Sequence, residues 1–513
     1  MAPRQFAVVV GVGQVRRRPG LDSELNGSWE PQEPIHLLRD AIHAALADAD
    51  VGTADVAALA VVDPIAWPYD DLIASTAAAA DLPGTVAGFT FAPGGNSPGD
   101  LLHVLANRMA DGEFAVAVLA GCEAVYSIRR ARKEGIDLKE QWTRATKPRD
   151  LQKGQAPLTT AVEARHGQMA PVHCYPLFEN ALRARAGRTM AEHQQVISAL
   201  MSRNSAVAAT NPYAWFPTAW TPEQIATVTP DNRWVCFPYP KRMNAIMEVD
   251  QSAALVLMTG DEADRRGIPR ERQVVFLGGA SAVDGWAPAE RIDLAGSPAI
   301  RAAGEAALVH AGITMDDVDL IDLYSCFPSA VQMGMDALGL AIDDPRGVTV
   351  TGGLAYAGGP GNSYALHSMC VATERLRGGD GEVALVSSLG MTATKHALSL
   401  LGVGKVVDGA DHHAHKVALD RSVTNGPDIV DGVTGDGVVE SYTVEYDRQG
   451  TAVRTFYVVR LDDGMRTVGV GPCTDDEVRA LTSGPDEPIG QRVHVDGSGE
   501  LNLVAFLAKS DRG

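Results

Sequence analysis

The sequence has little cysteine and no long hydrophobic run. It contains 513 residues and only six cysteines, and no two of these form a Cys-x-x-Cys pair, which argues against zinc-finger and thioredoxin-like sites. No stretch approaches the roughly 18 apolar residues that a membrane span requires, and residues 1–13 lack the apolar core and cleavage site of a signal peptide. Because sparse cysteines suit a reducing compartment, we expect a cytoplasmic protein without a membrane span.

Positive charge is also scarce. Lys and Arg number 44 against 64 Asp and Glu, a formal net charge of −20. This balance argues against nucleic-acid binding, which needs a positive surface, but it leaves room for a local basic patch that binds a phosphorylated small molecule. The length suffices for two or three domains, and 45% hydrophobic residues with 21% charged residues is an ordinary globular composition.

Apolar runs and helix-periodic segments alternate along most of the chain. Continuous apolar runs at 6–12, 56–62 and 114–120 predict buried strands, and the spacing of apolar residues predicts a helix over 34–49. A second set follows in a similar order without a strong residue-level repeat, with strands at 274–278, 318–323 and 383–387 and helices at 300–311 and 329–338. This alternation predicts an α/β layered architecture.

Two regions depart from the alternation. Residues 127–239 begin with a basic cluster and continue with many prolines and aromatics, which indicates a large insertion. After about residue 409, short β-branched segments at 438–446, 453–461, 466–470 and 491–495 are separated by Asp- and Gly-rich turns. This pattern predicts a small all-β module, a barrel or an OB-like fold.

Three histidines, His412, His413 and His415, lie just before the predicted β module. Imidazoles so close together could chelate a metal adventitiously. We assign them instead to a solvated linker, and we expect no metal site.

A glycine loop precedes the predicted helix over 97–110. Ser97 is a suitable N-cap, Pro98 suits the first helical position, and Asp100 follows three residues after the cap. The positive end of such a helix could lower the pKa of a thiol or hold an oxyanion, but Gly95 offers no side chain there. A well-capped core helix explains the pattern equally well.

Three later segments also combine glycines or polar residues with a strand end. Residues 322–328 follow a predicted strand and precede a helix, which places Tyr324 at the carboxyl edge of the sheet, where its phenol can donate a hydrogen bond or simply pack. Residues 352–367 are too glycine-rich for regular structure and suit backbone that approaches a ligand. His367 in this segment could face a pocket or pack within a helix. Ser388 follows another predicted strand.

In this order, the four segments resemble the active-site motifs of thiolases, and those of sterol-carrier-type thiolases in particular. The resemblance covers roughly residues 5–405. Gly95 takes the place of the nucleophilic cysteine, Tyr324 that of the histidine of the oxyanion hole, Gly359 that of the activating histidine, and Ser388 that of the acid/base cysteine.

The resemblance implies a duplicated thiolase fold, layered α/β/α/β/α, with an inserted loop domain and an additional C-terminal all-β domain. It divides the chain into an N-terminal half (1–126 and 240–270), a loop region (127–239), a C-terminal half (271–408) and an all-β domain (425–513). Thiolases generally pair through their central layers, but the additional segments could mask that surface, so a monomer or a homodimer is expected.

The resemblance also implies coenzyme A or an acyl-CoA as the ligand, with no further cofactor required, and a place among the acetyl-CoA acetyltransferases of lipid metabolism. The candidate catalytic residues are Tyr324, His367 and Ser388. The candidate binding residues are Asn96, Ser97, Gly358, Asn362, Arg129 and Arg132, the two arginines being placed to contact the 3′-phosphate.

The substitutions leave three functions open. Thiolysis and Claisen condensation require a covalent acyl-enzyme and a proton shuttle, so we expect an acyl-CoA-binding protein that performs neither reaction. A retro-aldol cleavage of β-hydroxyacyl-CoA needs only a general base and a stabilised enolate, and Tyr324 with Tyr356 or Tyr364 could handle the proton. A binding or scaffold protein without turnover is the third reading, and a closed pocket would favour it.

Overall fold

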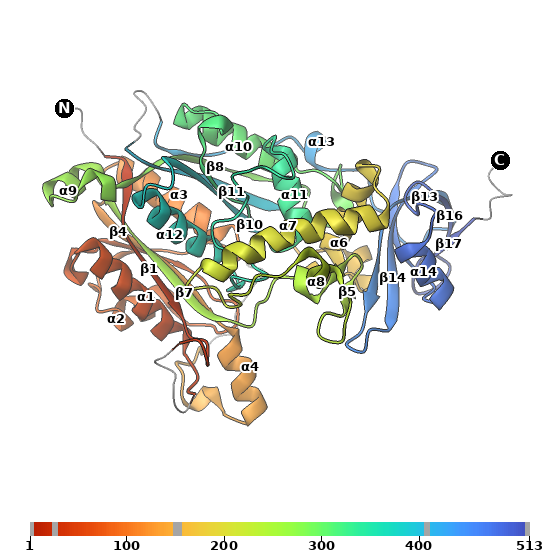
Figure 1. Cartoon of the computed structure of the whole chain (residues 1–513), viewed down its shortest axis with the longest axis horizontal. Helices are drawn as coiled ribbons and strands as arrows, with labels where there is room; N and C mark the ends of the chain where they lie inside the picture. Colours follow the sequence, from red (N-terminus) through yellow and green to blue (C-terminus); the bar gives the residue numbers. More distant parts are fainter. Residues whose placement is uncertain (1–4, 23–28, 147–155, 405–410, 508–513) are drawn as a thin grey trace.

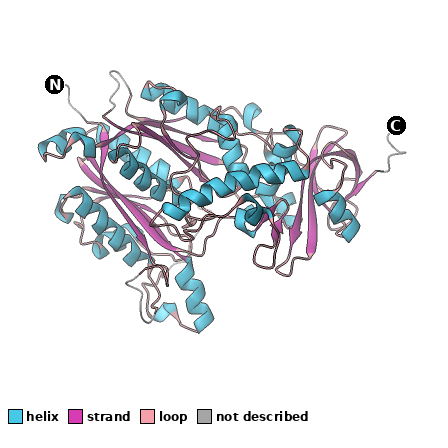
Figure 2. Cartoon of the chain, in the orientation of Figure 1, coloured by secondary structure: helices cyan, strands magenta, loops and turns pink. Residues whose placement is uncertain are grey.

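Two β-sheets organise the chain in the computed structural model, which describes residues 5–22, 29–146, 156–404 and 411–507. A ten-stranded sheet runs through a layered α/β part, and a seven-stranded sheet forms most of the C-terminal part. The C-terminal strands lie at one end of the long axis (Figure 1), and helices surround the strands of the α/β part (Figure 2). No helix among the described residues has the length and apolar character to cross a bilayer.

The first half of the larger sheet has the strand order β3-β2-β4-β7-β1. β2 and β4 are parallel, whereas β4–β7 and β7–β1 are antiparallel. β4 and β7 are buried along their whole length, as expected of strands covered on both faces. The elements are β1 (Ala7–Arg16), α1 (Pro34–Ala49), β2 (Ala58–Val62), α2 (Leu72–Ala79), β3 (Ala87–Phe89), α3 (Ser97–Ala110), β4 (Val116–Ala124) and β7 (Asp250–Thr259), followed by α9 (Gly260–Arg265).

The second half repeats this topology. Its strand order is β9-β10-β11-β8, with β9 and β10 parallel and with β10–β11 and β11–β8 antiparallel. β9, β10, β11 and β8 therefore correspond to β2, β4, β7 and β1, which confirms the expected duplication. The elements are β8 (Val274–Val283), α10 (Pro298–Ala311), β9 (Leu320–Asp322), α11 (Pro328–Ala337), α12 (Tyr364–Arg377), β10 (Val383–Gly390) and β11 (Lys395–Val403).

Helices α3 and α12 form the central layer. They contact each other and the strands of both halves, and their apolar residues share one buried cluster with residues of β1, β4, β7, β8 and β10. α1 covers β1 and β7 on the outer side of the first half, and α10 covers β8 and β11 on the outer side of the second. A short antiparallel pairing of β1 with β8 joins the halves. The layered α/β architecture is thereby confirmed.

The segment between β4 and β7 is mainly helical. It contains α4 (Val125–Glu134), α5 (Ala161–Arg165), α6 (Pro171–Arg185), α7 (Met190–Thr210) and α8 (Pro222–Ala226), followed by β5 (Trp234–Cys236) and β6 (Tyr239–Pro240). β5 pairs with β13 of the C-terminal sheet, and α6 packs on β13. The insertion and the C-terminal part are thus in direct contact.

The C-terminal part contains a closed five-stranded barrel. Its strands follow the order β14-β15-β17-β16-β13, and a further pairing of β13 with β14 closes the ring. The expected all-β module is confirmed, although β17 and a helix, α14, were not predicted. The elements are β12 (Ala414–Lys416), α13 (Arg421–Thr424), β13 (Gly435–Tyr446), β14 (Ala452–Leu461), β15 (Arg466–Gly471), α14 (Asp475–Ser483), β16 (Arg492–Asp496) and β17 (Leu503–Phe506).

A buried arginine attaches the barrel to the α/β part. The Arg466 guanidinium donates to the carbonyls of Ala289 and Arg291 at 2.7 and 2.6 Å, and its Nε lies 2.6 Å from a carboxylate oxygen of Glu440. The side chain of Arg466 is 2% exposed. An arginine removed from water in this way needs its full set of partners, so the contact constrains the orientation of the barrel.

Candidate functional site

The four segments singled out in the sequence meet at the centre of the α/β part. A Cβ atom built on Gly95 would overlap the Tyr324 hydroxyl and the Leu389 carbonyl oxygen, and one built on Gly99 would lie 2.9 Å from the Ser388 Oγ. The glycine-rich loop joins them, because the Leu354 N–H donates to the Ser325 Oγ at 3.3 Å. The fold therefore brings the start of α3, the end of β9, the glycine loop and the end of β10 together.

The Tyr324 phenol fills the space where residue 95 would carry a side chain. Its Cζ lies 2.8 Å from the position of a Gly95 Cβ, the residue is 7% exposed, and its ring packs edge-on against Tyr364. Burial raises the pKa of Tyr324 well above that of free tyrosine. At neutral pH this phenol therefore keeps its proton and can act as a hydrogen-bond donor.

The start of α3 differs from the sequence expectation. Asn96 is the N-cap residue and makes no side-chain cap hydrogen bond, so the assignment of Ser97 as the cap was wrong. Ser97 is the first helical residue, and its hydroxyl donates to the Ala92 carbonyl at 3.0 Å. The Asn96 amide instead donates to Asp100 at 2.5 Å, because the helical backbone conformation at Asn96 turns its side chain toward the next turn.

A lysine stands beside this helix start. The Lys395 ammonium donates to the Pro93 carbonyl at 3.0 Å and would lie 2.9 Å from a Cβ built on Gly94. Burial lowers the pKa of Lys395 to about 8, although the negative charge of Asp100 acts to raise it. Burial also raises the pKa of the Asp100 carboxyl to about 6. The site thus contains a cation and an acid whose protonation states change near neutral pH.

Ser388 is fully buried against α3. Its hydroxyl has no hydrogen-bond partner within the described part of the chain. The Asn96 Oδ1 is likewise buried without a partner there; a Cβ atom on Gly390 or Gly94 would overlap it. Buried polar atoms are almost always paired, so these two atoms are exceptions within the site.

The glycine-rich loop contains several backbone conformations that favour glycine. Gly352, Gly353, Gly358 and Gly361 have φ values of 104°, 81°, 107° and 53°. Gly359, the position matched to the lost histidine, donates its N–H to the Ile246 carbonyl at 2.8 Å. This hydrogen bond connects the loop to the segment just before β7. The loop is buried.

Side chains from neighbouring strands support this loop. A Cβ on Gly358 would overlap the Gln251 side chain, whose amide donates to the carbonyls of Ala357 and Tyr213, each at 2.9 Å. Below the loop, Asp322 accepts hydrogen bonds from Thr349 and Ser368 at 3.0 and 2.7 Å. Gln251 was not predicted as a site residue, since its contact with Ala357 joins segments far apart in the chain.

The other candidate residues lie further apart. His367, on α12, pairs its Nδ1 with the Gln14 Oε1 at 2.8 Å, and among the described residues it makes no hydrogen bond to Tyr324 or Ser388. Burial lowers the pKa of His367 to about 4, so the imidazole is neutral. The Asn362 amide donates to the Asp63 carbonyl at 3.1 Å.

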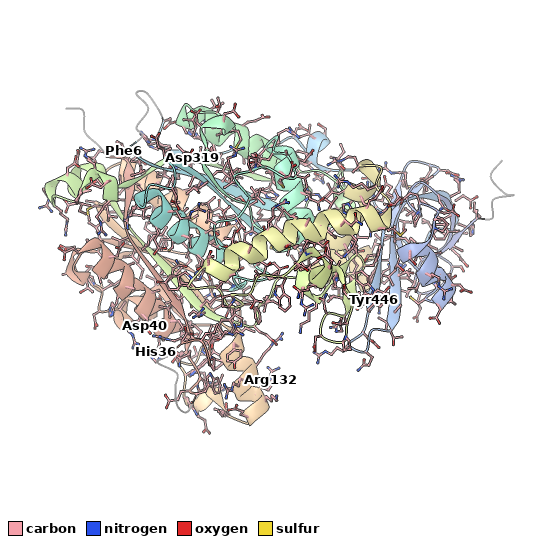
Figure 3. The ribbon with its side chains drawn as sticks, viewed as in Figure 1. Phe6, His36, Asp40, Arg132, Asp319 and Tyr446 are labelled. Atoms are coloured by element: carbon pink, nitrogen blue, oxygen red, sulfur yellow. The ribbon has the colours of Figure 1, made fainter. Side chains whose placement is uncertain are left out.

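The two candidate arginines come from α4. Arg129 forms an exposed ion pair with Glu248, and Arg132 is exposed on the projecting helix (Figure 3). Figure 3 shows α4 at the lower edge of the molecule, where it extends away from the barrel. Residues 147–153, the last part of the basic cluster in which we expected the 3′-phosphate contact, lie outside the described residues.

A strained loop connects β10 to β11. Met391 and Ala393 have φ values of 60° and 53°, which non-glycine residues rarely adopt and which cost about 1–3 kcal/mol each. The Arg291 guanidinium donates to the Ala393 carbonyl at 2.6 Å, and the Tyr175 hydroxyl accepts from the Ala393 N–H at 3.0 Å. These two contacts hold the loop beside Tyr324.

Asp284 holds the arginine in turn. Its carboxylate accepts from the Arg291 guanidinium at 2.9 Å and from the Ser297 hydroxyl, and the His396 ring lies 3.5 Å away. Burial alone would raise the pKa of Asp284, but the charges of Arg291 and His396 outweigh it and lower the pKa to about 2. Sequence reasoning missed Asp284 and Arg291, which lie in a loop after β8 without a local motif.

Comparisons with known proteins agree with this geometry. Residues 418–500 match the family described as the thiolase-like protein type 1 additional C-terminal domain. A monomeric SCP2-thiolase like protein type 1 from Mycobacterium smegmatis is 29% identical, with a TM-score of 0.78 over 99% of this chain and 100% of that chain. An Ltp2-ChsH2(DUF35) aldolase is 18% identical, with a TM-score of 0.58 over 79% of this chain and 100% of that chain, and shows a shared fold. No curated protein matched the sequence.

Replacing Gly95 tests the packing of Tyr324. The Gly95→Ala variant is expected to be less stable than the parent by about 1–3 kcal/mol, because the added methyl group overlaps both the Tyr324 phenol and the Leu389 carbonyl. Gly84→Ala is the matched control, since nothing lies within 4 Å of its added methyl group. Urea denaturation of both variants measures the difference, and equal stability would contradict the packing described here.

The Asp284 carboxylate predicts a pH dependence of stability. Because its pKa in the fold, about 2, lies below the ordinary value of 3.8, the charged form stabilises the protein above pH 4, and this contribution is lost as the pH falls toward 2. Asp284→Asn is expected to be less stable by about 2 kcal/mol above pH 4, with a gap to the parent that narrows below pH 4. Chemical denaturation from pH 7 to 3 measures the gap, with the exposed Asp476→Asn as control; a gap that stays constant would rule this account out.

Proposed function

Because the chain is a thiolase-like protein with an additional C-terminal domain, we propose that it binds coenzyme A thioesters and catalyses neither thiolysis nor Claisen condensation. Two features support the proposal. The layered α/β frame is retained in full, and the groups that would form and resolve an acyl-enzyme are replaced. The active-site frame then serves to bind a thioester without covalent chemistry.

The observation that carries this proposal is the position of the Tyr324 phenol. It occupies the place of a side chain on residue 95, so that position has neither a nucleophile nor space for one. A cavity of about 10 Å³, bounded by Tyr324, Leu389 and His396 among others, is about the size of a single water molecule. Packing this closed favours the scaffold reading, and a thioester would enter only if side chains move away from Tyr324. The acyl end of a bound thioester would therefore stop at the phenol, where a covalent intermediate cannot form.

The remaining candidate residues offer a noncovalent site. Tyr324 would donate a hydrogen bond to the thioester carbonyl, and the Lys395 ammonium would add positive charge beside Gly94. Asn96, Ser97, Gly358 and Asn362 would line the approach, with His367 and Ser388 behind it. Arg129 and Arg132 on α4 would contact the 3′-phosphate of coenzyme A, for which Arg129 must leave its ion pair with Glu248.

Calorimetric titration with coenzyme A and acetyl-CoA at low salt tests the binding proposal. We expect micromolar affinity, a reduction of about tenfold for Arg132→Ala because a charged phosphate contact is lost, and no thiolysis of acetoacetyl-CoA. Arg479→Ala, an exposed arginine on α14 of the barrel, is the control and should bind as the parent does. Absence of any binding would overturn the proposal in favour of the scaffold reading.

A second candidate function is the retro-aldol cleavage of a β-hydroxyacyl-CoA. In this reaction the bond between the α and β carbons breaks, its electron pair forms the thioester enolate, and the β-hydroxyl loses its proton and becomes a carbonyl. The specific observation in its favour is a protonated Tyr324 donor at Gly95 with Lys395 at the adjacent Gly94; the Lys395 pKa of about 8 suits a base. Tyr364 is already bonded to Thr351 at 2.6 Å, and the Tyr356 hydroxyl is buried without a partner among the described residues.

Tyr324→Phe separates the two functions. If cleavage occurs, this variant should lose turnover of β-hydroxyacyl-CoA by at least about 100-fold, because the donor to the enolate is removed, while its affinity for the substrate stays nearly unchanged. Tyr446→Phe, in the barrel (Figure 3), should turn over as the parent does. Product formation is followed by mass spectrometry, and unchanged turnover in Tyr324→Phe would eliminate the retro-aldol candidate.

We also infer that the chain is a monomer. The SCP2-thiolase like protein that it matches over nearly its whole length is described as monomeric, and the chain carries the same kind of additional C-terminal domain.

A further inference from the structure

We propose that the protein binds one divalent transition-metal ion of the Zn²⁺ class between His310, Asp411 and His415. The three residues come from two segments of the chain. His310 lies in the last turn of α10, whereas Asp411 precedes β12 and His415 is in β12. Their potential ligand atoms all lie within 4.8 Å of one another. None of these three residues belongs to the proposed thioester site around Tyr324.

The distances suit coordination. The His415 Nε2 lies 2.9 Å from the Asp411 Oδ2, and the His310 Nδ1 lies 3.8 Å from the same oxygen. Donor atoms around a tetrahedral zinc ion, bound at about 2.0–2.1 Å, are about 3.3 Å apart. The two observed separations lie on either side of this value, so rotation of the His310 and His415 side chains could bring the three donors onto one ion.

The backbone already holds the ligands together. The Asp411 N–H donates to the His310 carbonyl at 3.0 Å, which links the two segments directly. His415 is aligned with Ala280 by the parallel pairing of β12 with β8. The two imidazole rings are stacked with centroids 3.6 Å apart, so binding of one ion requires them to rotate out of this stack. The backbone contacts reduce the conformational entropy that binding would cost.

A fourth residue orients the carboxylate. The His413 Nδ1 lies 2.7 Å from the Asp411 Oδ1, and this leaves Oδ2 facing His415 and His310. Outer contacts of this kind commonly fix metal-binding carboxylates. The sequence analysis considered only the neighbouring histidines at 412–415 and indicated a solvated linker. It could not show that the distant His310 lies beside them.

The ligand set and its exposure favour one metal class. Two imidazoles and one carboxylate suit Zn²⁺, Ni²⁺ or Cu²⁺ and not the oxygen-binding Mg²⁺ or Ca²⁺. The side chains of His310, Asp411 and His415 are 33%, 43% and 34% exposed, so the ion can enter from solvent and water can complete its coordination. A bound ion would fasten β12, which leads to the barrel, onto the end of α10, and would therefore raise the melting temperature.

Titration of the full, tag-free protein with Zn²⁺ after chelator treatment and dialysis tests the proposal. The expected result is one equivalent per chain and a melting temperature that rises with Zn²⁺. His310→Ala and Asp411→Asn should each weaken binding by at least about tenfold and remove the thermal shift. His36→Ala, an exposed histidine on α1 (Figure 3), should bind as the parent does.

Two results would overturn the site. Absence of Zn²⁺ binding by the parent is one, and parent-like binding by His310→Ala is the other, because it would mean that the 411–415 segment chelates the ion adventitiously by itself. Circular dichroism confirms that each variant is folded, and binding of coenzyme A by His310→Ala provides a second check of integrity. Failure of the metal site would leave the proposed thioester binding untouched, since the two measurements use different ligands and residues.

Discussion

The close packing of the Tyr324 phenol against the backbone at Gly95 is the constraint on which the candidate site depends. Both a cysteine nucleophile and this tyrosine conformation need the same volume, so the structure can contain only one of them. Burial keeps the phenol protonated, which makes it a donor and not a base. The same contact also brings the Leu389 carbonyl close to Gly95, so the end of β10 and the start of α3 are fixed relative to each other. The packing therefore leaves no space for a side chain on residue 95.

The duplicated topology explains how four distant segments reach this point. In each half, a parallel strand pair is followed by antiparallel strands, and a helix from each half enters the central layer. The loops before α3 and α12 therefore lie between the two halves, at the ends of strands, where open α/β folds commonly bind ligands. The barrel contributes Val458 to the buried cluster that contains Tyr324 and Leu389. Arg466 attaches the barrel beside the strained loop through the carbonyl of Arg291.

Buried charges hold the strained parts of the site. Asp284 and Arg291 are both nearly inaccessible, and each would be costly alone. Together they offer hydrogen bonds to the Ala393 carbonyl and the Ser297 hydroxyl, which compensates for the left-handed backbone at Met391 and Ala393. At the start of α3, the charges of Lys395 and Asp100 also influence each other. The strained loop is thus positioned by the desolvated ion pair of Asp284 with Arg291.

Local pattern alone determined much of this protein. Apolar runs and helical spacing predicted β1, α1, β4 and four of the five barrel strands, because buried strands and amphipathic helices follow short-range periodicity. The residue types at 95, 359 and 388 led to the expectation that no acyl-enzyme forms. Local pattern failed at Ser97, which is the first helical residue and not the N-cap. Only the tertiary structure decided that Tyr324 fills the space beside Gly95, that Arg291 holds Ala393 and that His310 meets Asp411 and His415. Each of these contacts joins residues far apart in the chain, and such contacts depend on how whole layers pack, which no short segment encodes.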